Sequence, residues 1–178
     1  MHARMAAFSG SSRYRTDNIS NARARGLELA GTARALLGGS GGSIQVRVGY
    51  TRLATEILAV DQGGSAPPPF VVGDRLLRRP NNVFSADVLV SAGPLSAFLR
   101  GGGRSSTQDV DPSFGTFGGM FEAPGYNVWD IGASWAFWNR LQLFGRVLNL
   151  FDESYEEALG YPALGRSGMV GLRVATSR

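Results

Sequence analysis

The chain has 178 residues, 25 of them glycine, and its 18 basic residues, all arginine, exceed its 14 acidic residues to give a net charge of +4. The arginines are scattered rather than gathered into the basic stripe of a nucleic-acid interface, and the absence of cysteine excludes disulfides and cysteine–metal sites. A single histidine, His2, and the absence of lysine exclude Ser-His-Asp catalysis, histidine-based zinc sites and a phosphate-binding loop.

Several function classes are therefore set aside. We expect no enzymatic activity, because no general base accompanies the hydroxyl side chains, and we expect neither a cofactor nor a nucleic-acid partner. No stretch reaches the roughly 18–20 apolar residues of a membrane-spanning helix. The first residues, MHARMAAFSG, lack the apolar run of about 7–15 residues that a secretory signal needs.

Apolar and polar residues alternate along most of the chain, which is the period of a strand whose two faces meet different surroundings. In the clearest example, VWDIGASWAFW at 128–138, one face is apolar and aromatic while the other is small or polar. The same test predicts about eight strands, over 2–9, 27–37, 43–58, 84–92, 95–103, 128–138, 141–151 and 168–175.

Short and long connections alternate between these predicted strands. The short turns lie near 38–42, 93–94 and 139–140, and the long connections are 10–21, 59–80, 104–125 and 152–167. If neighbouring strands pair antiparallel, all long connections fall at one end of the sheet. This arrangement, with an apolar outer face, is typical of an outer-membrane barrel, because strands in hydrocarbon need every backbone group paired. We predict an all-β, antiparallel up-and-down transmembrane β-barrel segment of about eight strands.

The alternation also predicts which side chains share a face. We expect one polar set on the inner face: Gln45, Arg47, Asp87, Asp130, Gln142 and Arg146. We expect one apolar set on the opposite face: Val46, Val88, Ile131, Leu143 and Leu172. Aromatic residues suited to the membrane interfaces join the apolar face or end a strand: Tyr50, Trp129, Trp135, Phe137 and Trp138.

Residues 146–174 carry the most specific motif, two alternating runs around an elaborate corner. The motif consists of Asn149, Leu150, Phe151, Asp152, Tyr155, Gly160, Tyr161, Pro162, Gly165 and Arg166. It resembles the C-terminal end of TonB-dependent outer-membrane receptors. Three further stretches resemble that family in the same order: NARARGLEL (21–29), LLRRPNN (76–82) and APGYNVWDIGASW (123–135). A departure is the last residues, VATSR, where family chains usually end on an aromatic residue.

The resemblance implies that residues 1–178 form the C-terminal portion of a receptor barrel of about 22 strands. The signal peptide, the energy-coupling box and the plug domain would be absent from this portion. The intact receptor would lie in the outer membrane of a Gram-negative bacterium and take up a scarce ligand, such as an iron-siderophore or cobalamin. Its expected partners are outer-membrane lipid, the TonB system acting through the plug domain, and the barrel-assembly machinery.

The residue types in the corner by themselves also predict a structural role. Asn149 and Asp152 can bond neighbouring backbone where one strand ends, and Phe151 and Tyr155 can cover the exposed corner. Pro162 and Gly165 can then turn the chain towards the last strand. We therefore expect a structural role for the motif rather than ligand contacts.

Ligand contacts are expected instead in the long connection 104–125, since loops shape specificity. This connection combines polar anchors with aromatic surface, the mixture that a ligand site uses: Asp109, Asp111, Phe114, Phe117 and Phe121. The alternative is a flexible, glycine-rich loop without a ligand.

Two other hypotheses remain beside the receptor fragment. One is a self-contained eight-stranded outer-membrane barrel with a structural or adhesive role, and the other is a soluble small-ligand β-barrel. The residues expected on the inner face include small ones, which would leave the interior of an eight-stranded barrel underfilled. This favours a segment of a larger barrel. The small residues are Gly49, Ala136, Gly132 and Gly171. As a fragment, the chain should have edge strands at 2–9 and 168–175 and should aggregate without detergent.

Overall fold

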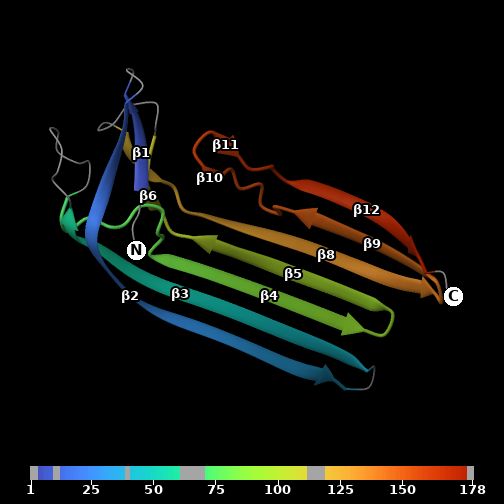
Figure 1. Ribbon diagram of the computed structural model, residues 1–178. Coiled ribbons are helices and arrows are strands. Elements are labelled where there is room, and N and C mark those ends of the chain that lie inside the picture. The colour runs from blue at the N-terminus through green and yellow to red at the C-terminus, as the bar shows by residue number, and fades with distance from the viewer. Residues whose placement is uncertain (1–3, 10–12, 39–40, 61–70, 112–118, 176–178) are drawn as a thin grey trace. The chain divides into compact units, whose positions relative to one another are not determined.

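The computed structural model describes residues 4–9, 13–38, 41–60, 71–111 and 119–175. Eight strands follow one another in a single sheet in sequence order, antiparallel wherever the register is described (Figure 1). These strands are β1 (Arg4–Ser9), β2 (Arg13–Leu37), β3 (Gly42–Val60), β4 (Asn82–Ala92), β5 (Leu95–Arg104), β8 (Tyr126–Trp138), β9 (Leu141–Leu148) and β12 (Ser167–Val174). In the described ranges, no helix is long and apolar enough to cross a bilayer.

The eight strands predicted from alternation are confirmed, but one predicted connection is wrong. Residues 10–21 were expected to form a long loop, whereas β2 begins at Arg13 and continues for 25 residues. The segment 13–26, RYRTDNISNARARG, is mostly polar and has no regular apolar positions. A test for alternation detects a strand only where one face is regularly apolar, so it does not detect this segment.

Two other long connections contain short hairpins. Within 104–125, β6 (Thr107–Val110) pairs with β7 (Met120–Ala123), and within 152–167, β10 (Glu156–Ala158) pairs with β11 (Tyr161–Pro162). The chain separates into two compact units, which are described one at a time below. Unit 1 comprises 1–27, 51–82 and 105–125, and unit 2 comprises 28–50, 83–104 and 126–178.

Unit 1 has a small apolar core of its own. Ile57 is fully buried and Ile19 nearly so, and four apolar residues pack against them: Val60, Leu76, Leu77 and Met120. The segment 71–82 is held to β3 by main-chain contacts, since the N–H of Ile57 donates to the carbonyl of Asp74 at 2.8 Å. The N–H of Leu76 donates to the hydroxyl of Thr55 at 3.0 Å. Residues 71–80 of the predicted connection 59–80 are therefore hydrogen-bonded to β3.

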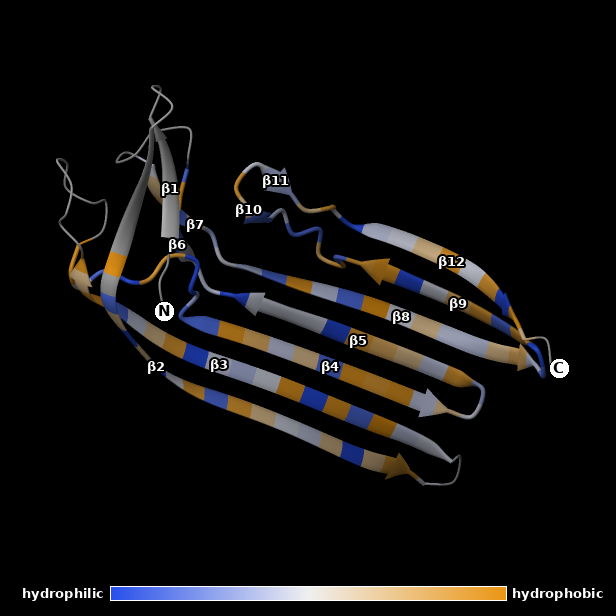
Figure 2. Ribbon diagram, viewed as in Figure 1, coloured by the Kyte–Doolittle hydropathy of each residue, from blue (hydrophilic) through white to orange (hydrophobic). Residues whose placement is uncertain are grey.

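Unit 2 is a sheet whose two faces differ. Residues in direct register share a face, and one register row is entirely apolar: Val88, Leu99, Ile131 and Val147. The neighbouring row on the other face is charged: Asp87, Arg100 and Asp130. The predicted separation of polar and apolar sets is confirmed on these strands, and the ribbon coloured by hydropathy shows the alternation along β3 and β4 (Figure 2).

The apolar face of unit 2 carries aromatic pairs near both ends of β8. Phe84 and Trp129 lie with ring centroids 6.4 Å apart, and Trp135 and Phe137 with centroids 5.5 Å apart. Six residue steps separate the two tryptophans along the strand, about 20 Å at roughly 3.3 Å per residue. Since barrel strands are tilted by about 35–45°, this length corresponds to about 15 Å of height, which lies within the apolar band of about 25 Å.

The register also orders the two ends of this sheet. Val83, Arg104 and Tyr126 are aligned at one end, while the tight turns at 93–94 and 139–140 lie at the other. The connections 105–125 and 149–166 consequently start from the same end of the sheet in unit 2, as the alternation of short and long connections predicts.

Candidate functional site

The polar face of unit 2 contains a shallow hollow of about 880 Å³, here called the polar hollow. Strands β2, β3, β4, β5 and β8 form its floor, and the segment after β9 contributes to its rim. The charged and tyrosine side chains that line it are Arg47, Asp87, Arg100, Tyr126, Asp130, Tyr155 and Glu157. Charge, hydrogen-bonding groups and aromatic surface are thus combined on one face, as in a ligand site.

An ion-pair network crosses the floor of the polar hollow. One carboxylate oxygen of Asp87 accepts a hydrogen bond from Nε of Arg100 at 2.9 Å. The other oxygen lies 3.7 Å from a guanidinium nitrogen of Arg47 on β3. Asp87 and Arg100 are direct partners in the β4–β5 register, so their pairing follows from strand alignment. Both arginine side chains are more than half exposed.

Two stacked tyrosines join the sheet to the loop after β9. The rings of Tyr126 and Tyr155 lie with centroids 4.2 Å apart, and the hydroxyl of Tyr126 donates to a carboxylate oxygen of Glu157 at 3.3 Å. The guanidinium of Arg104 lies over the Tyr126 ring, 4.8 Å from its centroid. This cluster offers a flat aromatic surface with charged groups beside it.

Asn149 organises the corner that carries the C-terminal motif. It is only 4% exposed and has a left-handed backbone with φ of 50°. Its side-chain amide donates to the carbonyls of Glu153 at 2.8 Å and Leu164 at 3.2 Å, and its side-chain oxygen accepts from the N–H of Glu153. One side chain therefore ties together three parts of the corner.

Asp152 and Gly160 shape the rest of that corner. Asp152, with φ of 57°, accepts a hydrogen bond from the N–H of Arg166 at 2.7 Å, and a Cβ on Gly165 would lie 3.0 Å from the same carboxylate oxygen. Gly160, with φ of 79°, forms the turn between β10 and β11, where Tyr161 and Pro162 follow.

Two other motif residues have distinct positions. The N–H of Leu150 donates to the carbonyl of Trp129 at 2.6 Å, which extends the contact between β9 and β8. Phe151 is 70% exposed and does not cover the corner, contrary to expectation. The corner is closed by hydrogen bonds instead, and Tyr155 stacks on Tyr126.

The ligand candidates in 104–125 lie in unit 1. Asp109 is 5% exposed and its carboxylate accepts from Nε of Arg78 and from the N–H of Val110, each at 2.7 Å. Phe121 is its register partner on β7, and the N–H of Asp111 donates to the carbonyl of Gly119. Phe114 and Phe117 lie outside the described residues. A ligand role for these five stays a prediction, and Asp109 already has a structural partner.

Aromatic rings fill two of the inner-face positions that the sequence left empty. The ring of Phe98 lies against Gly132 and that of Phe144 against Gly171, leaving no room for a Cβ at either glycine. At these two positions a cross-strand phenylalanine covers the glycine, and the underfilled interior of a closed eight-stranded barrel stays a prediction. Neither these phenylalanine–glycine contacts nor the polar hollow could be predicted from the sequence, since both depend on the register between strands.

Comparison with known proteins finds one family and several solved structures. The family described as TonB dependent receptor-like, beta-barrel matches residues 4–150. The siderophore receptor PiuA from Acinetobacter baumannii is similar over 95% of this chain and 24% of its own, with 16% identity and a TM-score of 0.66. The ferric-catecholate import receptor Fiu from E. coli K12 has 18% identity over 95% of this chain and 23% of its own, with a TM-score of 0.61.

A third similar structure is FpvA from P. aeruginosa bound to a heterologous pyoverdine and iron. It is similar over 97% of this chain and 23% of its own, with 16% identity and a TM-score of 0.61. At these identities the likeness concerns the fold. The chain spans about a quarter of the length of the structures that it resembles.

Proposed function

Because this chain belongs to the TonB-dependent receptor-like β-barrel family, we propose that it forms part of the wall of a receptor that takes up a scarce ligand, such as an iron-siderophore or cobalamin. Proteins of this family are outer-membrane proteins of Gram-negative bacteria and are not enzymes, which places the chain in that membrane. The uptake of a particular ligand is the part that we propose.

The observation that carries the proposal is the polar hollow on a sheet whose other face is apolar. An apolar face with aromatic pairs near both ends is typical of the lipid-facing side of a barrel wall. The opposite, polar face would then line the interior of the barrel. There, Arg100 and the stacked pair Tyr126–Tyr155 offer guanidinium donors and ring surface to a passing ligand. Iron-siderophore is favoured because the similar structures are named as siderophore, ferric-catecholate and pyoverdine-bound proteins.

We further propose that residues 1–178 are the C-terminal portion of the receptor barrel, with the remaining strands and a plug domain supplied by other segments. The order of the sheet supports this, because β1 and β12 stand at its two ends and need strand partners in a membrane. A closed eight-stranded barrel would pair those strands with each other. The TonB system would act through the plug, and the barrel-assembly machinery would insert the barrel.

Uptake of radioactive iron by cells that carry the complete receptor tests the proposal. Replacing Arg100 by Gln and Tyr126 by Ala should lower ligand affinity about tenfold, since each removes a charged or ring contact. Arg140→Gln, in the turn at the other end of β8, is the matched control and should leave uptake unchanged. Surface labelling must show equal amounts of each receptor. Unaltered affinity for every ligand that the receptor takes up would contradict the role of the polar hollow.

A further inference from the structure

Strand β3 has an exposed face in unit 1, opposite the apolar core of that unit. Thr55 and Ile57 are buried on the core side of the strand. Because side chains of a strand alternate between its two faces, Arg52, Ala54 and Glu56 lie on the other side. Arg52 and Ala54 are exposed there. This side of unit 1 is therefore open to a partner from outside the chain.

Strand β2 adds arginine side chains to the same exposed face. Gly26 lies on the core side, because a Cβ on it would be 3.4 Å from the side chain of Leu53. Its two chain neighbours, Arg25 and Leu27, consequently lie on the exposed face. The face thus combines charged and apolar side chains on two adjacent strands.

The ion pair between Arg23 and Glu56 fixes the alignment of the two strands. The glycine contact just described lies three residues later on β2 and three residues earlier on β3, so the strands are antiparallel, with Arg25 opposite Ala54. Arg52 is the diagonal neighbour of Arg25, a position about 7–8 Å away. The short side chain of Ala54 leaves room for both guanidinium groups. We call Arg23, Arg25 and Arg52 the arginine patch.

The arginine patch carries an excess of positive charge. Arg23 and Glu56 neutralise each other, with side chains 44% and 40% exposed. In the part of the chain that the structure describes, neither Arg25 nor Arg52 has a carboxylate at ion-pair distance, whereas two arginines in the segment 71–82 do. Like charges on adjacent strands destabilise a sheet. An anion bound between Arg25 and Arg52 would remove this repulsion.

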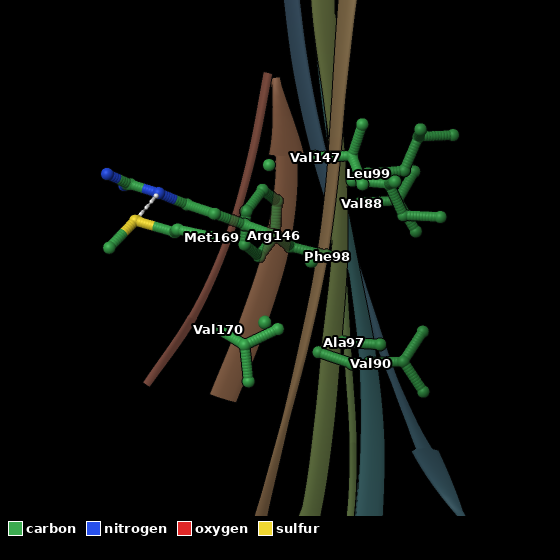
Figure 3. Close-up of a pocket in the computed structure, with 14 residues that line it drawn as sticks. Val88, Val90, Ala97, Phe98, Leu99, Arg146, Val147, Met169 and Val170 are labelled. Atoms are coloured by element: carbon green, nitrogen blue, oxygen red, sulfur yellow. Dashed lines mark hydrogen bonds between the residues drawn. The ribbon is translucent and has the colours of Figure 1, made fainter. Parts of the chain in front are cut away.

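The side chains of unit 2 indicate which side of β3 faces lipid. Figure 3 shows Val88 and Val147 on one side of the sheet, whereas the side chain of Arg146 lies on the other. Asp87, the residue before Val88, pairs with Arg47 of β3 on the polar face. The residues next to Arg47 in β3 therefore belong to the apolar side, which is the side that faces lipid in an outer-membrane barrel.

The apolar positions of β3 lead directly to the arginine patch. Val48 and Tyr50 are on the lipid-facing side, and the next position of the same alternation is Arg52. On β2, the exposed Leu27 likewise precedes the charged part of that face, two residues from Arg25. An aromatic ring at the end of an apolar band lies at the level of the lipid headgroups. We therefore expect the arginine patch at that level.

We propose that the arginine patch binds the phosphate group of a membrane lipid on the outside of the barrel. Unit 1 contains most of the long connections, and long connections are extracellular in such barrels, so the lipid belongs to the outer leaflet. Arg25 and Arg52 donate paired hydrogen bonds to the phosphate oxygens, a geometry that suits guanidinium groups. An acyl chain of the same lipid lies on Leu27. The site is separate from the polar hollow and does not depend on the transported ligand.

Native mass spectrometry of the folded chain in neutral detergent micelles tests this proposal. The probe is dimyristoyl phosphatidic acid, and the matched lipid is dimyristoyl phosphatidylcholine, in which choline neutralises the phosphate. Phosphatidic acid should bind at least about tenfold more tightly, since each arginine near a lipid surface contributes about fivefold. Arg25→Gln combined with Arg52→Gln should remove this preference. R25K combined with R52K should retain part of it, because the charge remains and the paired hydrogen bonds are lost.

The matched control removes two charges from the opposite face of the same two strands, through Arg34→Gln combined with Arg47→Gln. Arg34 lies on that face, because Gly31, three residues earlier, contacts Val48 on the apolar side. The control should keep the preference for phosphatidic acid, and circular dichroism must show equal strand content in the variants.

Three results would overturn the proposal. The first is equal binding of the two lipids to the wild-type chain, a comparison that needs no variant to fold. The second is a preference that survives in the glutamine variant of the arginine patch, or that is lost equally in the control. The third is displacement of phosphatidic acid by an equal concentration of inorganic phosphate, which would show a site for small free anions rather than for a lipid.

Discussion

The main-chain N–H of Asn149 donates a hydrogen bond to the carboxylate of Asp130, with 2.9 Å between nitrogen and oxygen. Asp130 lies in the middle of β8 on the polar face, while Asn149 follows the last residue of β9. The carboxylate therefore satisfies the first backbone donor beyond the strand. This contact connects the inner face of the sheet to the corner that carries the C-terminal motif.

Replacement of Asn149 by Ala should destabilise the folded chain by about 3 kcal/mol. The side chain makes three hydrogen bonds to backbone, each worth about 1 kcal/mol, and alanine tolerates the positive φ poorly. Urea unfolding in micelles measures the change. Asn127→Ala, at an exposed position on β8, is the matched control and should cost less than about 0.5 kcal/mol. Equal effects of the two variants would contradict the role of Asn149 in the corner.

Gly171→Ala should destabilise β12 by about 1–3 kcal/mol, because the added Cβ would meet the ring of Phe144 and force it aside. Gly168→Ala on the same strand is the control, since the nearest atom to its Cβ would be 3.6 Å away. Thermal unfolding followed by circular dichroism compares them. In a Phe144→Ala background the difference between the two glycines should disappear. If it persists there, the ring is not its cause.

The Asp87–Arg100 pair should contribute little to stability despite its good geometry. The Arg100 side chain is 66% exposed, and exposed ion pairs contribute about 0.2–1 kcal/mol. A double-mutant cycle with Asp87→Asn and Arg100→Gln measures the coupling free energy, which should fall when salt is raised from 0.05 to about 1 M. A coupling above about 2 kcal/mol, or one insensitive to salt, would indicate that the pair is shielded from water.

Arg78→Gln should loosen the β6–β7 hairpin in unit 1. Asp109 is buried, so loss of its guanidinium partner leaves a carboxylate with only the N–H of Val110 as a described partner. We expect faster hydrogen exchange at 107–110 and 120–123, with unchanged exchange in β9. Asp109→Asn in the Arg78→Gln background should restore part of the protection, because a neutral amide is less costly to bury. Slow exchange in the single variant would contradict this role for the ion pair.

The chain expressed by itself should accumulate in inclusion bodies and refold only with detergent. Its edge strand β12 exposes the apolar side chains of Val170, Leu172 and Val174. Unpaired strand edges beside an apolar face promote aggregation. Size-exclusion chromatography with and without detergent provides the measurement. A monodisperse monomer in plain buffer would contradict both the aggregation and the need for further strands.

The sequence by itself determined the strands of unit 2 and the face that each side chain joins. Alternation with a period of two is a local property, so the apolar positions Val88 and Ile131 identify their faces without knowledge of the partner strands. Asn149 could likewise be recognised, since its side chain accepts a hydrogen bond from the N–H of Glu153 within the same turn. The partner of Asp152, the N–H of Arg166, lies 14 residues further along the chain.

Tertiary structure decided everything that depends on register or on more than one segment. The first half of β2 carries no regular alternation of apolar and polar residues, and its place between β1 and β3 in the sheet became evident only from the fold. Asp109 looked like a ligand anchor until the fold placed Arg78 beside it. The contact of Phe144 with Gly171 arises between neighbouring strands, and hydropathy along one strand contains no information about the side chains of the next.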